Sequence, residues 1–180
     1  MRMDFNKTLN LLIKEFSKKK IRYAVIGGFA VGVWGFARNT LDLDILVDKN
    51  DLEKIDNIMQ KLFYKRVFSS ENVSQYVSDI VALGEVDFIH AFRFYSTRAL
   101  KRAKKKKLGD IYLKIAAVED IVGFKLQAMT NDKKRQGKEL LDIKELLRLN
   151  RKRIDWRLLE EYFTLFNKKK LFKKLKDEAL

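Results

Sequence analysis

The sequence has no cysteine and no proline, and His90 is its only histidine. Without cysteine the chain has no disulfide, no thiolate nucleophile and no cysteine-ligated zinc. A single histidine argues against an imidazole-rich metal site and against a Ser-His-Asp triad, so we expect His90 to be structural. Among metal-binding and catalytic side chains, the carboxylates of Asp and Glu therefore remain as the main candidates.

Long apolar runs are missing as well. No stretch approaches the roughly 20 apolar residues that span a bilayer, and the N-terminal stretch has no apolar block of the signal-peptide kind. The chain has 180 residues, of which 47% are hydrophobic and 12% aromatic, a composition that predicts a folded core rather than disorder. We therefore expect a soluble, cytoplasmic protein that does not enter a membrane.

The formal charge of +15 is unevenly distributed. Residues 1–90 have 13 Lys or Arg and 12 Asp or Glu, whereas residues 91–180 have 26 and 12. A field of one sign attracts polyanions, so nucleotides, RNA, DNA and an anionic membrane surface are candidate partners of the second half. A solvated basic face that favours solubility is the alternative, and the lysines of 168–176 fit an amphipathic, solvent-facing helix.

Hydrophobic periodicity indicates alternating strands and helices, followed by helices alone. The fold class that we predict is α/β (α+β), with a mixed sheet flanked by helices and with helices at the C-terminal end. In chain order we expect a helix capped by Asp4, strand 21–26, helix 29–37, strand 41–47, helix 51–63, strands 76–83 and 85–91 with Gly84 as the turn, a surface or mobile basic block at 101–107, edge strand 111–115, and helices 118–130, 137–149 and 155–175, the last broken near Asn167.

Two aspartates alternate with apolar residues in the predicted strand 41–47. Residues two apart on a strand point to the same face, so Asp42 and Asp44 project together while Leu41, Leu43 and Ile45 enter the core. Like charges on one face repel, and aspartate is depleted in strands, so a cation is expected between them. Mg²⁺ (or Mn²⁺) suits this pair, because it is held by one or two carboxylates and completed by phosphate oxygens and water.

A pair of glycines precedes these aspartates at the predicted start of a helix. Free N–H groups and the helix dipole favour an anion there, and glycine lets the backbone approach a phosphate closely. We therefore expect Gly27 and Gly28 to bind the phosphates of a nucleotide. Arg38 and Thr40 are candidates for further phosphate contacts, with a surface position as the alternative.

A third carboxylate, Asp87, lies in the middle of the predicted strand 85–91. If that strand neighbours the Asp42 strand, Asp87 completes a cluster that binds a second metal ion or accepts the proton of an acceptor hydroxyl. On the helix 118–130, Lys125 has apolar neighbours. It is expected either to reach a phosphate or to extend its ammonium group to solvent.

These motifs together resemble the DNA polymerase β-like nucleotidyltransferase superfamily. The resemblance covers roughly residues 21–150: a hydrophobic strand, Gly-Gly, then Arg-x-Thr-x-Asp-x-Asp and a later strand aspartate. Within the superfamily, the chain looks most like small prokaryotic proteins of the AbiEii toxin type and related uncharacterised nucleotidyltransferases. Those families also have a second motif, for which the corresponding residues here are Lys125, Arg135, Lys138 and Asp142; Glu139 stands where an aspartate is usual.

The resemblance implies transfer of a nucleoside monophosphate from a nucleoside triphosphate (NTP) to an acceptor hydroxyl, with release of pyrophosphate. It implies Asp42, Asp44 and Asp87 as catalytic, metal-binding residues and adds Lys125 and Lys138 to the nucleotide-binding set. From the chain length we expect one compact domain, with a nucleotidyltransferase core at 1–115 and the helical part 116–180 packed on it.

Three functions stay open at this point. The basic second half favours RNA, such as a transfer RNA 3′ end, as the acceptor. The same chemistry on a protein or on a small molecule such as an aminoglycoside is the first alternative, and a non-catalytic member that binds nucleotide or nucleic acid is the second. An antitoxin is a further candidate partner.

Overall fold

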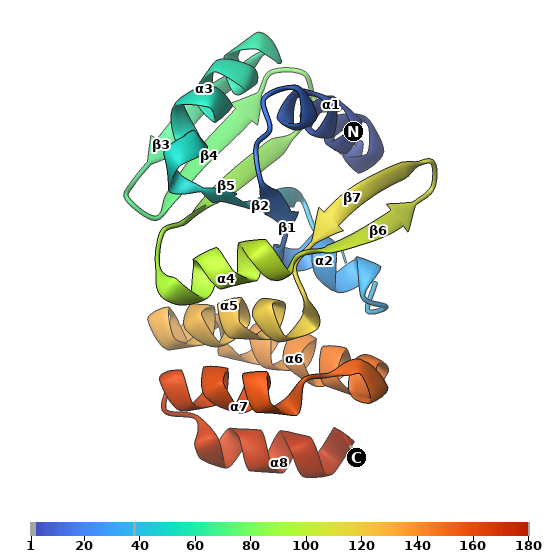
Figure 1. Ribbon diagram of the computed structural model, residues 1–180, viewed down its shortest axis with the longest axis vertical. Helices are drawn as coiled ribbons and strands as arrows, with labels where there is room; N and C mark the ends of the chain where they lie inside the picture. Colours follow the sequence, from blue (N-terminus) through green and yellow to red (C-terminus); the bar gives the residue numbers. More distant parts are fainter. Residues whose placement is uncertain (1–2, 38, 180) are drawn as a thin grey trace. The chain divides into compact units, whose positions relative to one another are not determined.

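The computed structural model describes residues 3–37 and 39–179 of the chain. The chain folds into two compact units (Figure 1). Unit 1 comprises Met1–Phe29 and Asn39–Ala116, and unit 2 comprises Ala30–Arg38 and Ala117–Leu180. The predicted division into a core at 1–115 and a helical part at 116–180 stays a prediction.

A seven-stranded mixed sheet forms the centre of unit 1, with the strand order β3-β4-β5-β2-β1-β7-β6. The β2–β5 and β1–β7 pairs are parallel and the other pairs are antiparallel, so the expected mixed sheet is confirmed. The strands are β1 (Tyr23–Val25), β2 (Asp42–Asp48), β3 (Tyr64–Ser69), β4 (Val73–Ser78), β5 (Glu85–Ala91), β6 (Lys104–Leu108) and β7 (Ile111–Ile115).

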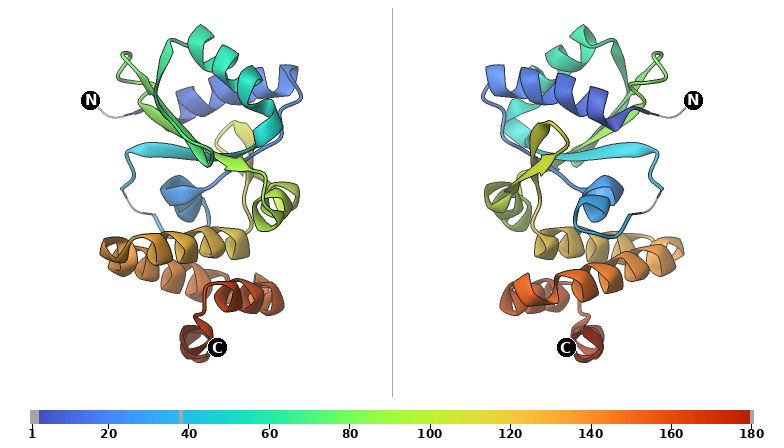
Figure 2. Two further views of the ribbon diagram at one scale, coloured as in Figure 1. Left: turned by 90° about the vertical axis from the view of Figure 1, so that its left-hand side faces the viewer. Right: turned by 90° about the vertical axis from the view of Figure 1, so that its right-hand side faces the viewer.

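Helices cover both faces of this sheet. Figure 2 shows α1 (Phe5–Lys18) and α3 (Leu52–Lys61) on one face and α4 (Phe94–Arg102) on the other. Asp4 caps α1 as predicted, its side chain accepting a hydrogen bond from the backbone N–H of Lys7 at 3.0 Å. The apolar side chains of β2 and β5 face α1, where the rings of Phe16 and Phe88 lie 6.2 Å apart.

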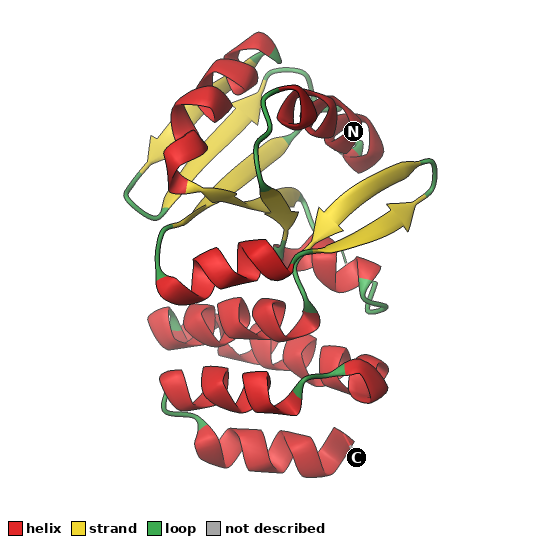
Figure 3. Ribbon diagram, viewed as in Figure 1, coloured by secondary structure: helices red, strands yellow, loops and turns green. Residues whose placement is uncertain are grey.

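Unit 2 is helical, as the sequence predicted for its C-terminal part (Figure 3). Its helices are α5 (Val118–Asn131), α6 (Gln136–Asn150), α7 (Trp156–Leu165) and α8 (Lys169–Ala179). The break near Asn167 is confirmed, and Asn167 there has a positive φ of 56°. No helix in the described part of the chain is long and apolar enough to cross a membrane.

Several predicted boundaries were wrong. Strand β4 begins and ends earlier than 76–83, because Gly84 closes a longer connection, 79–84, instead of a tight hairpin turn. Helix α2 (Gly27–Val33) begins at the glycines and ends before 37. Strand β3 and helix α4 were missed. β3 is exposed at five of its six residues and lacks the alternation of a half-buried strand, and α4 ends in Lys101 and Arg102, which were assigned to the basic block.

The edge of the sheet formed by β7 and β6 also differs from prediction. The 111–115 segment is an interior strand, since β7 pairs with both β1 and β6, and the edge strand is β6. The basic block 101–107 lies at the surface as expected, but it is regular: Lys101 and Arg102 end α4, and Lys104–Lys107 belong to β6. Exposed lysines are compatible with an edge strand because water solvates their ammonium groups.

Candidate active site

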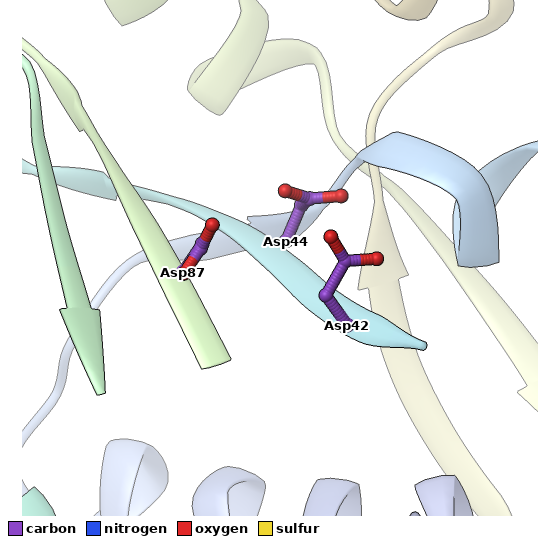
Figure 4. Close-up of side chains that lie close together, drawn as sticks. All are labelled: Asp42, Asp44 and Asp87. Atoms are coloured by element: carbon purple, nitrogen blue, oxygen red, sulfur yellow. The ribbon is translucent and has the colours of Figure 1, made fainter. Parts of the chain in front are cut away.

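The parallel pairing of β2 and β5 brings the three predicted carboxylates together. Asp44 pairs directly with Asp87 across the two strands, so the adjacency on which the third carboxylate depended is present. Figure 4 shows the side chains of Asp42, Asp44 and Asp87 projecting from the same side of the strands. One carboxylate oxygen from each of the three lies within 4.8 Å of the others.

The apolar neighbours explain why these acids project from the sheet. Leu43 and Ile45 on β2, and Val86 and Phe88 on β5, are at most 1% exposed. The expectation that Leu41 enters the core was wrong: it is 75% exposed, because it precedes the first residue of β2. Alternation along each strand therefore turns the aspartates to the opposite face, where they are half-buried. The burial of the apolar set determines the side from which the acids emerge.

Hydrogen bonds hold the carboxylates of Asp42 and Asp87 in place. The Thr40 hydroxyl donates to Oδ1 of Asp42 at 2.9 Å, and the side-chain amide of Gln75 donates to Oδ2 of Asp87 at 2.9 Å. Gln75 was missed, since the predicted strand began at residue 76. Gln75 could have been identified only from the β4–β5 register, in which it pairs with Asp87, and the sequence does not contain that register.

The electrostatics of the cluster favour a bound cation. Burial raises the pKa of Asp87, the hydrogen bond from Gln75 opposes this, and the charges of Asp42 and Glu85 raise the pKa further. Carboxylate oxygens are the ligands that Mg²⁺ and Mn²⁺ prefer, and a divalent ion would relieve the repulsion between the acids. The donor set and its spacing therefore fit a divalent metal.

Gly27 is in close contact with this cluster. A Cβ atom at position 27 would lie 1.8 Å from Oδ2 of Asp44, and the φ of Gly27 is +64°. Glycine is therefore required both by the backbone conformation and by the carboxylate beside it. Gly28 follows as the second residue of α2 and is buried. Phosphate binding by these two glycines stays a prediction.

Lys125 lies in unit 2, where its ammonium group donates to Glu139 at 2.7 Å and to Asp142 at 2.5 Å. The Lys125 side chain is 7% exposed, so the expectation that it extends to solvent was wrong. Arg135 also binds Glu139, at 2.6 Å. Four residues of the second motif therefore form one ion-pair cluster, which α5 and α6 can build because they lie side by side.

The remaining predicted residues lie apart from these contacts. Lys138 is exposed on α6, and Arg38 lies outside the described residues. Nucleotide binding by Lys125, Lys138, Thr40 and Arg38 stays a prediction. His90 is structural, as expected: it is 4% exposed, and its ring nitrogens contact the Ser74 hydroxyl and the Glu71 carbonyl oxygen.

The family model of an uncharacterised nucleotidyltransferase matches residues 2–173 of the chain. The chain belongs to this family. This match confirms the prediction that the chain is a member of the nucleotidyltransferase superfamily. The finer resemblance to AbiEii-type toxins stays a prediction. A search of curated proteins finds no match for this nucleotidyltransferase.

Solved structures share the fold of this nucleotidyltransferase at low sequence identity. The antibiotic-resistance factor ANT(2'')-Ia is 10% identical, with a TM-score of 0.67 over 99% of this chain and 100% of that chain. The lincomycin-bound lincosamide antibiotic adenylyltransferase LnuA is 17% identical, with a TM-score of 0.61 over 83% of this chain and 99% of that chain. An antigenic nucleotidyltransferase-like protein from Paracoccidioides brasiliensis is 16% identical, with a TM-score of 0.60 over 99% of this chain and 95% of that chain.

Proposed function

We propose that this nucleotidyltransferase transfers a nucleoside monophosphate from an NTP to an acceptor hydroxyl and releases pyrophosphate. The observation that carries the proposal is the convergence of Asp42, Asp44 and Asp87 on one side of β2 and β5. These residues would hold one or two Mg²⁺ (or Mn²⁺) ions. Such ions, when bound, neutralise charge on the phosphoryl oxygens.

The reaction forms one bond to phosphorus, breaks another, and releases the proton of the acceptor hydroxyl. The acceptor oxygen attacks the α-phosphorus of the NTP, and the bond from that phosphorus to the oxygen bridging to the β-phosphate breaks, so that pyrophosphate leaves. Asp87 either joins the metal ligands or accepts the proton of the acceptor hydroxyl. Thr40 keeps the Asp42 carboxylate in position through its hydrogen bond.

Backbone amides and polar side chains would together bind the nucleotide. Gly27 and Gly28 would contact phosphate oxygens through backbone N–H groups, and the close approach at Gly27 is compatible with this role. The resemblance also assigns Arg38, Thr40, Lys125 and Lys138 to nucleotide binding, and we keep that assignment as part of the proposal.

RNA, including the 3′ end of a transfer RNA, is the acceptor that we favour. The net positive charge of residues 91–180 supports a polyanionic acceptor. An aminoglycoside is less compatible with that charge, because such antibiotics have several protonated amines. A small-molecule acceptor is the second candidate, since the fold is shared with an antibiotic-resistance factor and a lincosamide adenylyltransferase.

The test incubates the purified protein with each of the four α-labelled NTPs and Mg²⁺ or Mn²⁺. Total RNA, a protein extract and an antibiotic set serve as separate acceptors. We expect label on RNA, a loss of about 100-fold or more in Asp44→Asn, and full activity in Asp79→Asn, a matched change at an exposed carboxylate. Label on the antibiotics alone would assign the second candidate. Absence of label from every acceptor would overturn the transferase proposal.

A further inference from the structure

The β6–β7 hairpin at the edge of the sheet is strongly basic. Residues 104–115 have five lysines and one acid, Asp110. Four of these cations, Lys104–Lys107, are consecutive in β6. The hairpin is labelled in Figure 1, and none of the proposed catalytic roles uses it.

Strand register collects the charges on one face of the hairpin. Lys105 pairs with Lys114 and Lys107 pairs with Tyr112, and directly paired residues share a face. All four side chains are exposed, whereas Leu113 on the other face of β7 is buried. We call these four residues, Lys105, Lys107, Tyr112 and Lys114, the outer hairpin face.

The outer hairpin face lies on the same face of the sheet as the carboxylate cluster. Val25 of β1 pairs with Ile45 of β2 and with Ile115 of β7. Val25, Ile45 and Ile115 therefore share one face of the sheet. Asp44 and Lys114, each one residue earlier, point to the opposite face together. Three interstrand spacings separate β2 from β6, a distance of roughly 14 Å.

Protection of the sheet edge explains only part of this pattern. Lysines on an edge strand discourage pairing with other chains, which accounts for cations on β6. Edge protection does not require Lys114 on the interior strand β7, directly opposite Lys105, where like charges are unfavourable. Among the described residues, no carboxylate lies within ion-pair distance of the ammonium groups of Lys105, Lys107 or Lys114.

Tyr112 adds an aromatic surface to these cations. Its side chain is 53% exposed, and the Lys105 ammonium lies 4.5 Å from the centre of its ring. A cationic surface with an exposed ring suits single-stranded nucleic acid, because cations contact the phosphates and an unstacked base lies on the ring.

We propose that the outer hairpin face binds a single-stranded nucleic acid whose terminal hydroxyl is the acceptor. The inference rests on the proposed function and names where its acceptor is held. Lys105, Lys107 and Lys114 contact backbone phosphates, Tyr112 stacks on a base, and a few nucleotides span the distance to the carboxylate cluster.

Fluorescence anisotropy of a labelled 12-nucleotide RNA and a DNA of the same sequence tests the binding, without NTP or metal. In Lys105→Gln/Lys107→Gln we expect roughly tenfold weaker binding and a slope of log K against log salt that is smaller by about 1.4. The matched control is Lys7→Gln/Lys14→Gln, which removes the same charge from exposed positions on α1, on the opposite face of the sheet. We expect the control to change affinity by less than about twofold.

A second pair of variants separates stacking from charge. Tyr112→Ala should weaken binding by roughly tenfold and Tyr112→Phe should preserve it, because the ring provides the stacking surface. Equal weakening by the hairpin and α1 double variants, or equal affinity of Tyr112→Ala and wild type, would overturn the proposal. Wild-type binding to vesicles of anionic lipid in place of both oligonucleotides would also overturn it.

The binding assay is independent of catalysis. Binding that depends on the hairpin, together with no nucleotidyl transfer to any acceptor, would overturn the proposed function and the acceptor role but keep the nucleic-acid site. Transfer to RNA that is unaffected by Lys105→Gln/Lys107→Gln would overturn the present proposal and keep the transferase.

Discussion

Oδ2 of Asp44 occupies the space that a Cβ atom at Gly27 would need, with only 1.8 Å between the two positions. Gly27→Ala should therefore displace the Asp44 carboxylate and weaken divalent-metal binding by roughly tenfold or more, in addition to straining a backbone with φ of +64° by about 1–2 kcal/mol. Isothermal titration with Mn²⁺ measures the first effect and thermal unfolding the second.

Gly109→Ala is the matched control for this prediction. Gly109 has a similar φ of +56°, but a Cβ there would meet nothing within 4 Å. The Gly109→Ala variant should show the conformational strain and retain normal Mn²⁺ binding. Equal Mn²⁺ affinity in the two variants would contradict the close packing of Gly27 against Asp44.

Removing one acid from the cluster should stabilise the metal-free protein. Asp42→Asn relieves like-charge repulsion, an effect of about 0.2–1 kcal/mol, and should raise the melting temperature in EDTA. Mg²⁺ at 100 times its dissociation constant should stabilise the wild type by about 2.7 kcal/mol and stabilise Asp42→Asn much less. A melting temperature of the wild type that is the same in EDTA and in saturating Mg²⁺ would count against the metal site.

The same variant separates a catalytic from a non-catalytic member of the family. In a protein that only binds nucleotide or nucleic acid, Asp42→Asn gains stability and no cellular phenotype changes. In the enzyme that we propose, it gains stability without metal and loses nucleotidyl transfer. Label transfer by Asp42→Asn at the wild-type rate would contradict the catalytic assignment.

Lys125 should be essential to the stability of unit 2. Lys125→Met leaves the carboxylates of Glu139 and Asp142, each 1% exposed, without the ammonium group that both contact. Breaking a buried ion pair in this way costs about 3–5 kcal/mol, which urea unfolding measures. Lys144→Met, at a more exposed ion pair with Glu178, should cost about 1 kcal/mol or less.

Acid should destabilise the protein partly through Glu139. Burial alone would raise the pKa of Glu139, but the hydrogen bond and charge of Lys125, with Arg135, outweigh burial and lower its pKa below 4.5. A carboxyl group with a lower pKa in the folded state adds stability above its unfolded pKa, and this stability is lost as the pH falls through the folded-state pKa. The free energy of unfolding should therefore fall below about pH 4.5, and less steeply in Glu139→Gln.

Local pattern determined much of the site. Apolar residues at every second position turn Asp42 and Asp44 to one face of β2 without any information from elsewhere in the chain, and Val86 and Phe88 do the same for Asp87. The Gly-Gly pair at a helix start and the C-terminal helices followed from equally local rules of capping and periodicity. These features depend on residues within a few positions of one another.

Tertiary structure alone decided which strands are neighbours. The pairing of Asp44 with Asp87, the hydrogen bond from Gln75 and the ion pairs of Lys125 join residues far apart in sequence, and alternation along one strand contains no information about its partner. The outer hairpin face arises in the same way: the lysines of β6 look like a solvated block until the register with β7 sets Lys105 beside Lys114. Because side chains alternate with a period of two, a register shift of one residue would place Asp87 on the apolar face and remove the cluster.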